Sequence, residues 1–274
     1  HTATDFSNKG AERVDMNICA IDCSSVSCSV CILQDGKVLS SVYQNTGLTH
    51  SQTLLVNIRF ALQQAGMTVA DMDQIAVTTG PGSFTGIKIG VATAKGLAFA
   101  KDIECVGISS LQAAAAAGLL DEPDKPCQAN VSADCCTSPE TEQKQLQNGR
   151  MIIAVMDARR NMFYNANFRL NNHQMIRLCE DRQIGFEELL QQADPDSLVI
   201  GDGADLFCRL AQERGRTFFK AGANLKYIHA ETVALLAWKG YGTRCSAMQL
   251  QPVYLRPSQA ERERLEKLKK ESST

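Results

Sequence analysis

The residues best suited to bind or transform a ligand are concentrated in a glycine-rich stretch, residues 79–90, with the sequence TGPGSFTGIKIG. The stretch follows a strand-like run at 74–78 and leads into a helical segment that ends near residue 100. Its GPG sequence is typical of a tight turn, and Ser83 stands where a helix N-cap belongs. A strand, a tight loop and a helix N-terminus can together bind an anion, because the first N–H groups of a helix are unpaired.

The spacing in this stretch departs from the common phosphate-binding and nucleophile motifs. A Walker loop needs four residues between its first glycine and the Gly-Lys pair, whereas three residues separate Gly82 from Gly86 and Ile87 follows. The dinucleotide pattern G-x-G-x-x-G fails because Gly86 comes one residue late, and G-x-S-x-G fails because Ser83 directly follows Gly82. We therefore expect a structural turn, with a phosphate-binding or catalytic loop as the alternative.

Small residues recur every four positions in the helix that follows the loop. One stripe comprises Gly86, Gly90, Ala94 and Ala98, and a second comprises Ala92, Gly96 and Ala100. Residues four apart share a helix face, and each interior glycine costs on the order of 1 kcal/mol relative to alanine. Such glycines indicate a close backbone approach, and the spacing leaves open whether the neighbour is the helix's own sheet or a helix of another subunit.

A second candidate contact surface lies on the preceding helix, which we expect between a cap at Thr49 or Ser51 and Gly66. Its main apolar face is expected to comprise Leu54, Leu55, Ile58, Ala61, Leu62 and Ala65. Val56 and Phe60 lie about half a turn away, on an otherwise polar face. An adjacent apolar pair that includes a phenylalanine indicates a second contact surface.

The composition is that of an ordinary soluble globular protein. The chain has 274 residues, 44% of them hydrophobic and 21% charged, and its net charge is −2. The chain therefore has no excess of positive charge that would by itself favour binding to nucleic acid. The sequence shows neither an apolar run long enough to span a membrane nor a signal-peptide pattern, so we expect a cytoplasmic protein.

Cysteine and histidine usage predicts a reduced protein without a coherent set of metal ligands. The eleven cysteines are odd in number and irregular in spacing. Cys28 and Cys31 have C-x-x-C spacing, but within a strand their side chains point to opposite faces. The four histidines are His1, His50, His173 and His229, and none has a second histidine at helical spacing. Five cysteines lie in apolar strand-like runs, where a thiol behaves as a small hydrophobe: Cys19, Cys23, Cys28, Cys31 and Cys105.

The elements that would position these residues follow a repeated order. Three strands come first, and the hairpin signal Asp35-Gly36 joins the second strand to the third. Helix, strand, helix, strand and helix follow, which is the order of one ribonuclease H-like half. A second run of strands and helices resumes at residue 151. We therefore expect an α/β fold with an N-terminal subdomain at 16–118 and a C-terminal subdomain at 151–256.

Three segments lie outside this order. Residues 1–15 are polar and are expected to be an extension or a cloning remnant. Residues 119–150 contain three prolines and no hydrophobic period, so a mobile connector is expected, and its Cys127, Cys135 and Cys136 lack the histidine of a zinc knuckle. Residues 257–274 are expected to form a charged helix or tail with a solvated face, with a docking segment as the alternative.

Residues 16–111 resemble the TsaB (YeaZ-like) family, which functions in tRNA threonylcarbamoyladenosine biosynthesis. The glycine-rich stretch at 79–90 is the most specific match, and IDCSS from Ile21, THS from Thr49, AKGLA from Ala94 and VGISSL from Val106 accompany it. Weaker matches in the second half are DARR from Asp157, GDGA from Gly201 and PVYLR from Pro252. The resemblance implies an actin/sugar-kinase/Hsp70-like (ASKHA) fold of two ribonuclease H-like subdomains.

The resemblance also implies a function as a non-catalytic scaffold. Such a chain binds and activates a homologous catalytic subunit (TsaD-like), which places threonylcarbamoyl on the adenosine beside the anticodon, and a small ATPase (TsaE-like) joins them. It implies no catalytic residue, metal or cofactor in this chain, contact with tRNA mainly through the complex, and no membrane association. A homodimer that uses the partner-binding face of the chain is expected when the chain is alone.

Two enzymatic alternatives from related folds must be weighed. A metallopeptidase is one, but the metal-binding histidine pair of the catalytic relatives corresponds to Ser110 and Ala114 here. An ATP phosphotransferase is the other, and such enzymes have glycine where this chain has Ser24, whose Cβ crowds the approach of phosphates. Asp22 is then either a remnant acid or, more simply, the cap of a hairpin turn.

We expect the partner interface to comprise Val56, Phe60, Gly86, Gly90 and Ala94. The two helices that carry them should be neighbours on one side of the sheet, with Phe60 buried by the partner. The alternative is that both small-residue stripes are buried by the chain's own sheet.

Overall fold

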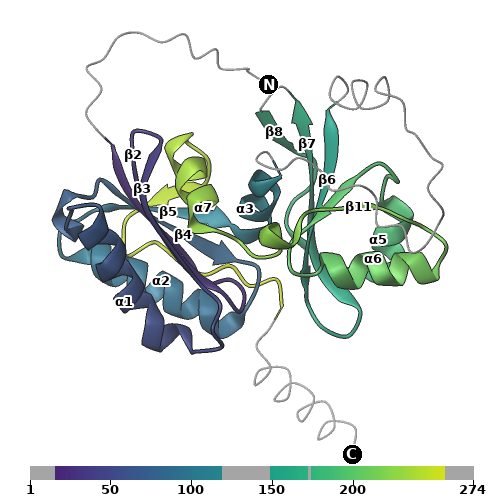
Figure 1. The fold of residues 1–274 in the computed structure, drawn as a ribbon, viewed down its shortest axis with the longest axis horizontal. Coiled ribbons are helices and arrows are strands. Elements are labelled where there is room, and N and C mark those ends of the chain that lie inside the picture. The colour runs from purple at the N-terminus through teal and green to yellow at the C-terminus, as the bar shows by residue number, and fades with distance from the viewer. Residues whose placement is uncertain (1–15, 119–148, 172–173, 257–274) are drawn as a thin grey trace, which may run out of the picture.

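The structure is a computed structural model that describes residues 16–118, 149–171 and 174–256 (Figure 1). The expected extension at 1–15, nearly all of the connector at 119–150 and the C-terminal helix or tail at 257–274 lie outside the described residues.

The first lobe is built on a six-stranded mixed sheet. Its N-terminal elements are β1 (Asn17–Asp22), β2 (Cys28–Gln34), β3 (Lys37–Gln44), α1 (His50–Gln64), a 3₁₀ turn (Val69–Asp71), β4 (Gln74–Gly80), α2 (Phe84–Phe99), β5 (Glu104–Ser109) and α3 (Ser110–Ala117). The strand order is β12-β5-β4-β1-β2-β3, with β1, β4 and β5 parallel and the β1–β2–β3 meander antiparallel. Asp35 and Gly36 both have positive φ, 48° and 80°, as the predicted hairpin turn requires.

The second lobe repeats this arrangement. It comprises β6 (Arg150–Asp157), β7 (Met162–Asn171), β8 (Gln174–Arg177), β9 (Arg182–Gly185), α5 (Phe186–Gln192), β10 (Leu198–Ile200), α6 (Ala204–Glu213), β11 (Phe219–Lys220) and a 3₁₀ turn (Ala223–Leu225). The strand order β8-β7-β6-β10-β11 corresponds to β3-β2-β1-β4-β5 in the first lobe, and β9 pairs with the free part of β7. The expected α/β fold of two related subdomains is confirmed.

The C-terminal part of the chain returns to the first lobe, contrary to the expected boundary of 151–256 for the second subdomain. Helix α7 (Ala230–Trp238) packs on β1 and β2, and β12 (Thr243–Cys245) pairs antiparallel with β5. The side chain of Ser29 on β2 accepts a hydrogen bond of 2.8 Å from the backbone N–H of Ala230, the first residue of α7. The physical reason is that the first sheet is apolar on both faces and needs α7 to cover the face opposite α1 and α2 (Figure 1).

The period of two along β1 assigns its side chains to two cores. Cys19 and Ile21 face α1 and α2, whereas Ile18 and Ala20 face α3 and α7. The second core continues through α3 to Ile152 and other residues of the second sheet, so it joins the lobes. Cys28 and Cys31 lie in different cores, as their spacing predicts.

Candidate functional site

Helices α1 and α2 lie side by side on one face of the first sheet, as expected (Figure 1). On α1 the side chains of Val56 and Phe60 are 64% and 52% exposed. Leu55 was expected on the buried face but is 59% exposed, because it lies at the edge of the apolar arc whose centre, at Leu54 and Ile58, is buried. The exposed apolar patch on α1 is therefore larger than expected.

The three expected interface residues on α2 are buried by the chain's own sheet. A Cβ on Gly86 would overlap the carbonyl oxygen of Cys23, and one on Gly90 would lie 3.4 Å from Cys23 Cβ and 3.6 Å from Val77. Ala94 is fully buried. This stripe explains the close packing of α2 on β1 and β4. The expectation that Gly86, Gly90 and Ala94 lie on the partner interface is therefore corrected, because they lie on the inner face of α2.

The second stripe of α2 faces outward instead. Ala92 and Gly96 are exposed, and a Cβ on Gly96 would meet nothing within 4 Å. Phe99 at the end of α2 is 69% exposed. We name six exposed apolar and small residues of the two helices the α1–α2 face: Leu55, Val56, Phe60, Ala92, Gly96 and Phe99.

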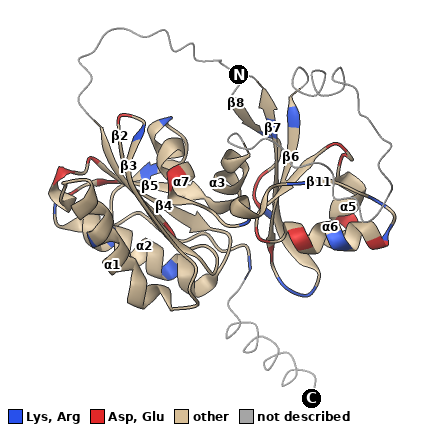
Figure 2. Cartoon of the chain, in the orientation of Figure 1, with Lys and Arg blue, Asp and Glu red and all other residues tan. Residues whose placement is uncertain are grey.

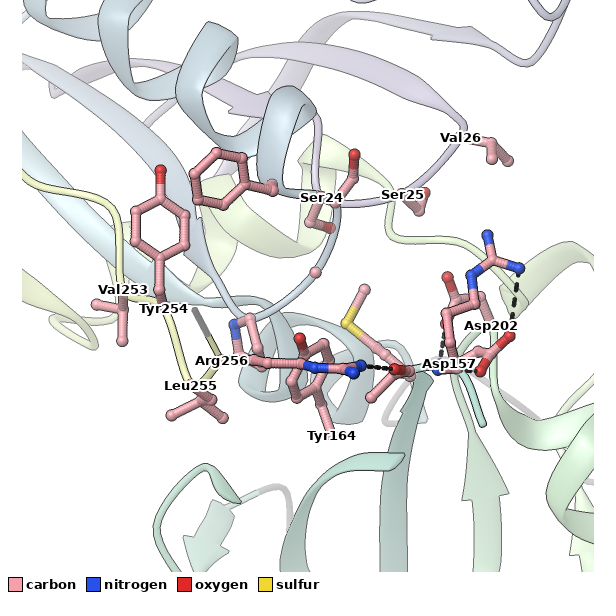
Figure 3. Close-up of a pocket in the computed structure, with 17 residues that line it drawn as sticks. Ser24, Ser25, Val26, Asp157, Tyr164, Asp202, Val253, Tyr254, Leu255 and Arg256 are labelled. Atoms are coloured by element: carbon pink, nitrogen blue, oxygen red, sulfur yellow. Dashed lines mark hydrogen bonds and ion pairs between the residues drawn. The ribbon is translucent and has the colours of Figure 1, made fainter. Parts of the chain in front are cut away.

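A cleft of about 320 Å³ lies between the two lobes, and Tyr164, Asp202 and four longer segments line it (Figure 3). The segments are the loop after β1, the glycine-rich loop after β4, the end of β6 and the C-terminal segment at 251–256. The cleft is where a ligand between two such lobes would bind, so the residues that line it are the second candidate site.

The glycines of the glycine-rich loop contact protein backbone. The backbone N–H of Ser83 donates a hydrogen bond of 2.7 Å to the carbonyl oxygen of Ser24. Gly82 has φ of +151°, and a Cβ there would overlap the same carbonyl oxygen. Gly80 approaches the carbonyl oxygen of Val253 equally closely. The hydroxyl of Ser83 accepts a hydrogen bond from the N–H of Gly86 and caps α2 as predicted. These contacts support the structural turn.

Asp22 is fully buried beneath the cleft, and its contacts are those of a turn cap. Its Oδ1 accepts hydrogen bonds from the hydroxyls of Ser24 and Thr78, each at 2.7 Å, and from the N–H of Ser24. Burial raises the pKa of Asp22, and these hydrogen bonds oppose that shift. Its Oδ2 makes no hydrogen bond within the described chain.

The second lobe contributes a pair of carboxylates to the cleft. Asp202 accepts a hydrogen bond of 3.1 Å from the backbone N–H of Asp157. Burial, together with the negative charge of Asp157, raises the pKa of Asp202 to about 6. Arg256 approaches from the C-terminal segment and donates a 2.7 Å hydrogen bond to the carbonyl oxygen of Ala158 (Figure 3). The two carboxylates on this side of the cleft therefore face two arginines: Arg159 lies 3.8 Å from Asp157, and Arg256 is engaged by backbone.

At the two positions that the resemblance aligns with the histidine pair of the catalytic relatives, this chain has no imidazole. Ser110 and Ala114 are both buried in α3, and Ala114 packs within the core that joins the lobes. A set of possible metal ligands that the sequence did not indicate lies elsewhere in the first lobe. Cys23, Cys28 and His50 place one ligand atom each within 4.8 Å of one another at the base of α1.

Comparison with known proteins places this geometry in context. The family of tRNA N6-adenosine threonylcarbamoyltransferases (TsaD) matches residues 44–137. The tRNA threonylcarbamoyladenosine biosynthesis protein TsaB of Bacillus subtilis is 26% identical over 262 residues, which cover 93% of this chain and all of the relative. The solved structure of YeaZ from Pseudomonas aeruginosa superposes with a TM-score of 0.67 at 28% identity, covering 88% of this chain and all of YeaZ. The resemblance to the TsaB (YeaZ-like) family is confirmed.

The TsaB-like chain is also similar over part of its length to threonylcarbamoyltransferases. The tRNA N6-adenosine threonylcarbamoyltransferase of Bacillus subtilis is 32% identical over 114 residues, which cover 36% of this chain and 33% of that enzyme. In the part of the TsaB-like chain that the structure describes, no helix is long and apolar enough to cross a membrane.

Proposed function

We propose that this TsaB-like chain is a non-catalytic subunit in tRNA threonylcarbamoyladenosine biosynthesis, and that it binds and activates a homologous TsaD-like catalytic subunit. The observation that carries the proposal is the α1–α2 face, an exposed apolar surface on two adjacent helices. Exposed apolar patches of this kind are typical of protein contact sites.

The composition of the two helices favours a protein partner with an acidic rim. Helix α1 contains one charged residue, Arg59, and α2 contains two, Lys88 and Lys95. All three are cationic, and the other residues of these helices are uncharged (Figure 2). An apolar centre with sparse charge is the usual anatomy of a stable interface.

A TsaD-like partner fits this surface because it would carry related helices. The TsaD family match at residues 44–137 spans both α1 and α2. Two homologous lobes can therefore pack their helix pairs against each other in a four-helix contact, and a homodimer would use the same face. The exposed Ala92 and Gly96 would let the partner's helices approach closely.

Features of the cleft support the proposal that this chain has no catalytic activity. The glycine-rich loop is occupied by contacts with the backbone of Ser24 and Val253, and Ser24 carries the Cβ that crowds a phosphate. Ser110 and Ala114 replace the histidine pair. We propose that a small TsaE-like ATPase joins the complex, that tRNA is contacted mainly through the partner, and that the complex acts in the cytoplasm, where it would meet tRNA.

Reconstitution tests the proposal. The chain is combined with a TsaD-like subunit, a TsaE-like ATPase, a threonylcarbamoyl donor and tRNA, and the modified nucleoside is quantified by mass spectrometry. We expect modification only when both the chain and the TsaD-like subunit are present, together with a stable complex on gel filtration. Equal modification without the chain, or modification by the chain alone, would overturn the proposal.

A further inference from the structure

Three metal-ligating side chains from separate segments meet at the base of α1. Cys23 follows β1, Cys28 begins β2 and His50 begins α1. The antiparallel register that pairs Asp22 with Ser29 continues to Cys23 and Cys28, so the hairpin brings the two thiols together. Their sulfurs are 3.9 Å apart, and a ring nitrogen of His50 lies within 4.8 Å of both.

The separation of the sulfurs suits two ligands of one tetrahedral ion. Thiolates at about 2.3 Å from Zn²⁺ with tetrahedral angles lie roughly 3.8 Å apart, and a thiolate and an imidazole nitrogen lie roughly 3.6 Å apart. The observed 3.9 Å between Cys23 Sγ and Cys28 Sγ therefore needs little adjustment. The ring nitrogen of His50 lies within 4.8 Å of both sulfurs, which exceeds the ideal sulfur–nitrogen separation by no more than about 1.2 Å.

The hydrogen bonding of His50 leaves one ring nitrogen available as a ligand. Nε2 lies 2.9 Å from the carbonyl oxygen of Ser25. A carbonyl oxygen can only accept, so Nε2 carries the proton and Nδ1 carries the free lone pair. Nδ1 is buried and finds no hydrogen-bond partner in residues 16–118, 149–171 or 174–256. Metal-bound histidines typically donate their other N–H to a backbone carbonyl in this way.

The surroundings of the two thiols favour a bound cation. Both are buried, with Cys23 beneath α2 at Gly90 and Cys28 beneath α1. Asn57 on α1 directs its Nδ2 toward Cys28 Sγ at 3.8 Å, as an outer-shell donor to a metal-bound thiolate would.

A purely structural role for the thiols is the simpler reading, and Cys31 illustrates it. Cys31 lies on the opposite face of β2, packed in the core with α7, where a thiol acts as a small hydrophobe. That reading explains buried cysteines but leaves the lone pair of His50 Nδ1 buried without a donor. We propose that Cys23, Cys28 and His50 bind one thiophilic metal ion of the Zn²⁺ or Cu⁺ class.

The ion would have a structural effect. Binding of Zn²⁺ would displace one proton from each thiol, giving two thiolates that balance the charge of the ion, and solvent would supply the fourth ligand. The bound ion would join the β1–β2 hairpin to the first turn of α1. This inference is independent of the proposed function, because it requires neither the partner nor any activity.

Metal titration of the reduced, metal-free full chain tests the inference. Zn²⁺ is titrated against a chromophoric chelator and Cu⁺ against a cuprous chelator, in a background with Cys127, Cys135 and Cys136 changed to serine, because those thiols lie outside the described residues. We expect one equivalent of at least one of the two ions to bind. Cys23→Ser and Cys28→Ser should weaken binding by more than the roughly 10- to 100-fold typical of losing an outer-shell partner.

A matched control and a variant-free measurement keep the test decisive. Cys31→Ser removes a buried thiol three positions from Cys28 on the other face of β2, and it should leave the affinity within about twofold of the background. X-ray absorption of the loaded background protein, with residues 23, 28 and 50 unaltered, should show two sulfur ligands and one imidazole. Stoichiometric binding of neither ion, equal binding after Cys23→Ser, or a shell of nitrogen and oxygen alone would overturn the inference.

Discussion

The backbone N–H of Ser83 and the carbonyl oxygen of Ser24 are joined by a 2.7 Å hydrogen bond that fastens the glycine-rich loop to the loop after β1. Gly82 permits this approach, because any Cβ there would overlap the Ser24 carbonyl. The first lobe thus uses its most ligand-like loop to bind its own backbone. The surface through which the protein would act is then the outer face of α1 and α2, away from the cleft.

Phe60→Glu should abolish binding to the TsaD-like subunit without unfolding the chain. Phe60 is 52% exposed, so a carboxylate there costs the isolated chain little, whereas it would be buried at an apolar interface. Loss of an interface hot spot costs at least about 2 kcal/mol, or roughly 30-fold in Kd. Isothermal titration of the two subunits measures the effect, and thermal melting checks the fold.

Ile176→Glu is the matched control for this change. Ile176 is 45% exposed on β8 of the second lobe, far along the chain from the α1–α2 face, and binding should be unaffected. Native affinity of Phe60→Glu, or equal loss with Ile176→Glu, would show that another surface binds the partner.

Two glycines on α2 should respond oppositely to alanine. At Gly86 a Cβ would overlap the backbone oxygen of Cys23, so Gly86→Ala should destabilise the fold by about 1–3 kcal/mol. At Gly96 a Cβ meets nothing within 4 Å, and Gly96→Ala should stabilise the helix by roughly 0.5–1 kcal/mol. Urea unfolding of both variants gives the two free energies, and the same sign for both would contradict the assignment of the inner and outer stripes.

Ser29→Ala should weaken the attachment of α7 to the first sheet. The buried hydroxyl of Ser29 accepts from the N–H of Ala230 at 2.8 Å, and its removal leaves that N–H buried without a partner. The expected loss is about 1–3 kcal/mol in the free energy of unfolding. Ser40→Ala on the half-buried strand β3 serves as control and should change stability little. An unaltered melting curve for Ser29→Ala would mean that α7 does not depend on this hydrogen bond.

Asp202→Asn should stabilise the protein at neutral pH. The folded-state pKa of Asp202 is raised to about 6, above the roughly 3.9 of an unfolded aspartate. The folded chain therefore holds the proton of the Asp202 carboxyl more tightly than the unfolded chain does. The contribution of this proton to stability is present below about pH 4 and is lost as pH rises through about 6. The free energy of unfolding that the variant gains over the wild type should thus grow between these pH values and level off at about 1–2 kcal/mol. This figure is smaller than the full pKa shift would give, because Asp202 is partly exposed and solvent screens its charge.

The neighbouring Asp205 provides a control of opposite sign. Hydrogen bonds from Lys220 and Lys226 lower the pKa of Asp205, so its contribution is present at neutral pH and lost as pH falls. Asp205→Asn should therefore reduce stability slightly near pH 7 and have no effect in acid. A gain from Asp202→Asn that does not vary with pH would contradict the assignment of its pKa.

Local chemistry explains which features could be predicted from the sequence. The Asp35-Gly36 turn, the Ser83 cap and the opposite orientations of Cys28 and Cys31 each depend on a few adjacent residues. The return of β12 to β5 depends instead on pairing between residues more than a hundred positions apart, and a three-residue strand carries no local signal for it. For this reason the boundary of the second subdomain was wrong.

The candidate site was predicted only in part, for two physical reasons. Four-residue spacing shows that α2 packs closely against something, but it cannot tell the sheet at Cys23 from a partner. The cluster of Cys23, Cys28 and His50 was missed because it depends on cross-strand register and on the first residue of α1, whereas C-x-x-C and paired-histidine spacings are local. Extending the β1–β2 register from Asp22 and Ser29 would have placed Cys23 opposite Cys28.

The pairing of β12 with β5 has a consequence for synthesis on the ribosome. Until Thr243–Cys245 is made, β5 is an open edge of the first sheet, and α7 is not yet available to cover its apolar face. At roughly 5–20 residues per second the interval after β5 lasts on the order of ten seconds. During that time a nascent chain presents an unpaired strand that can associate with other chains, so the first lobe, although translated first, is expected to complete its folding last and to be the part that chaperones protect.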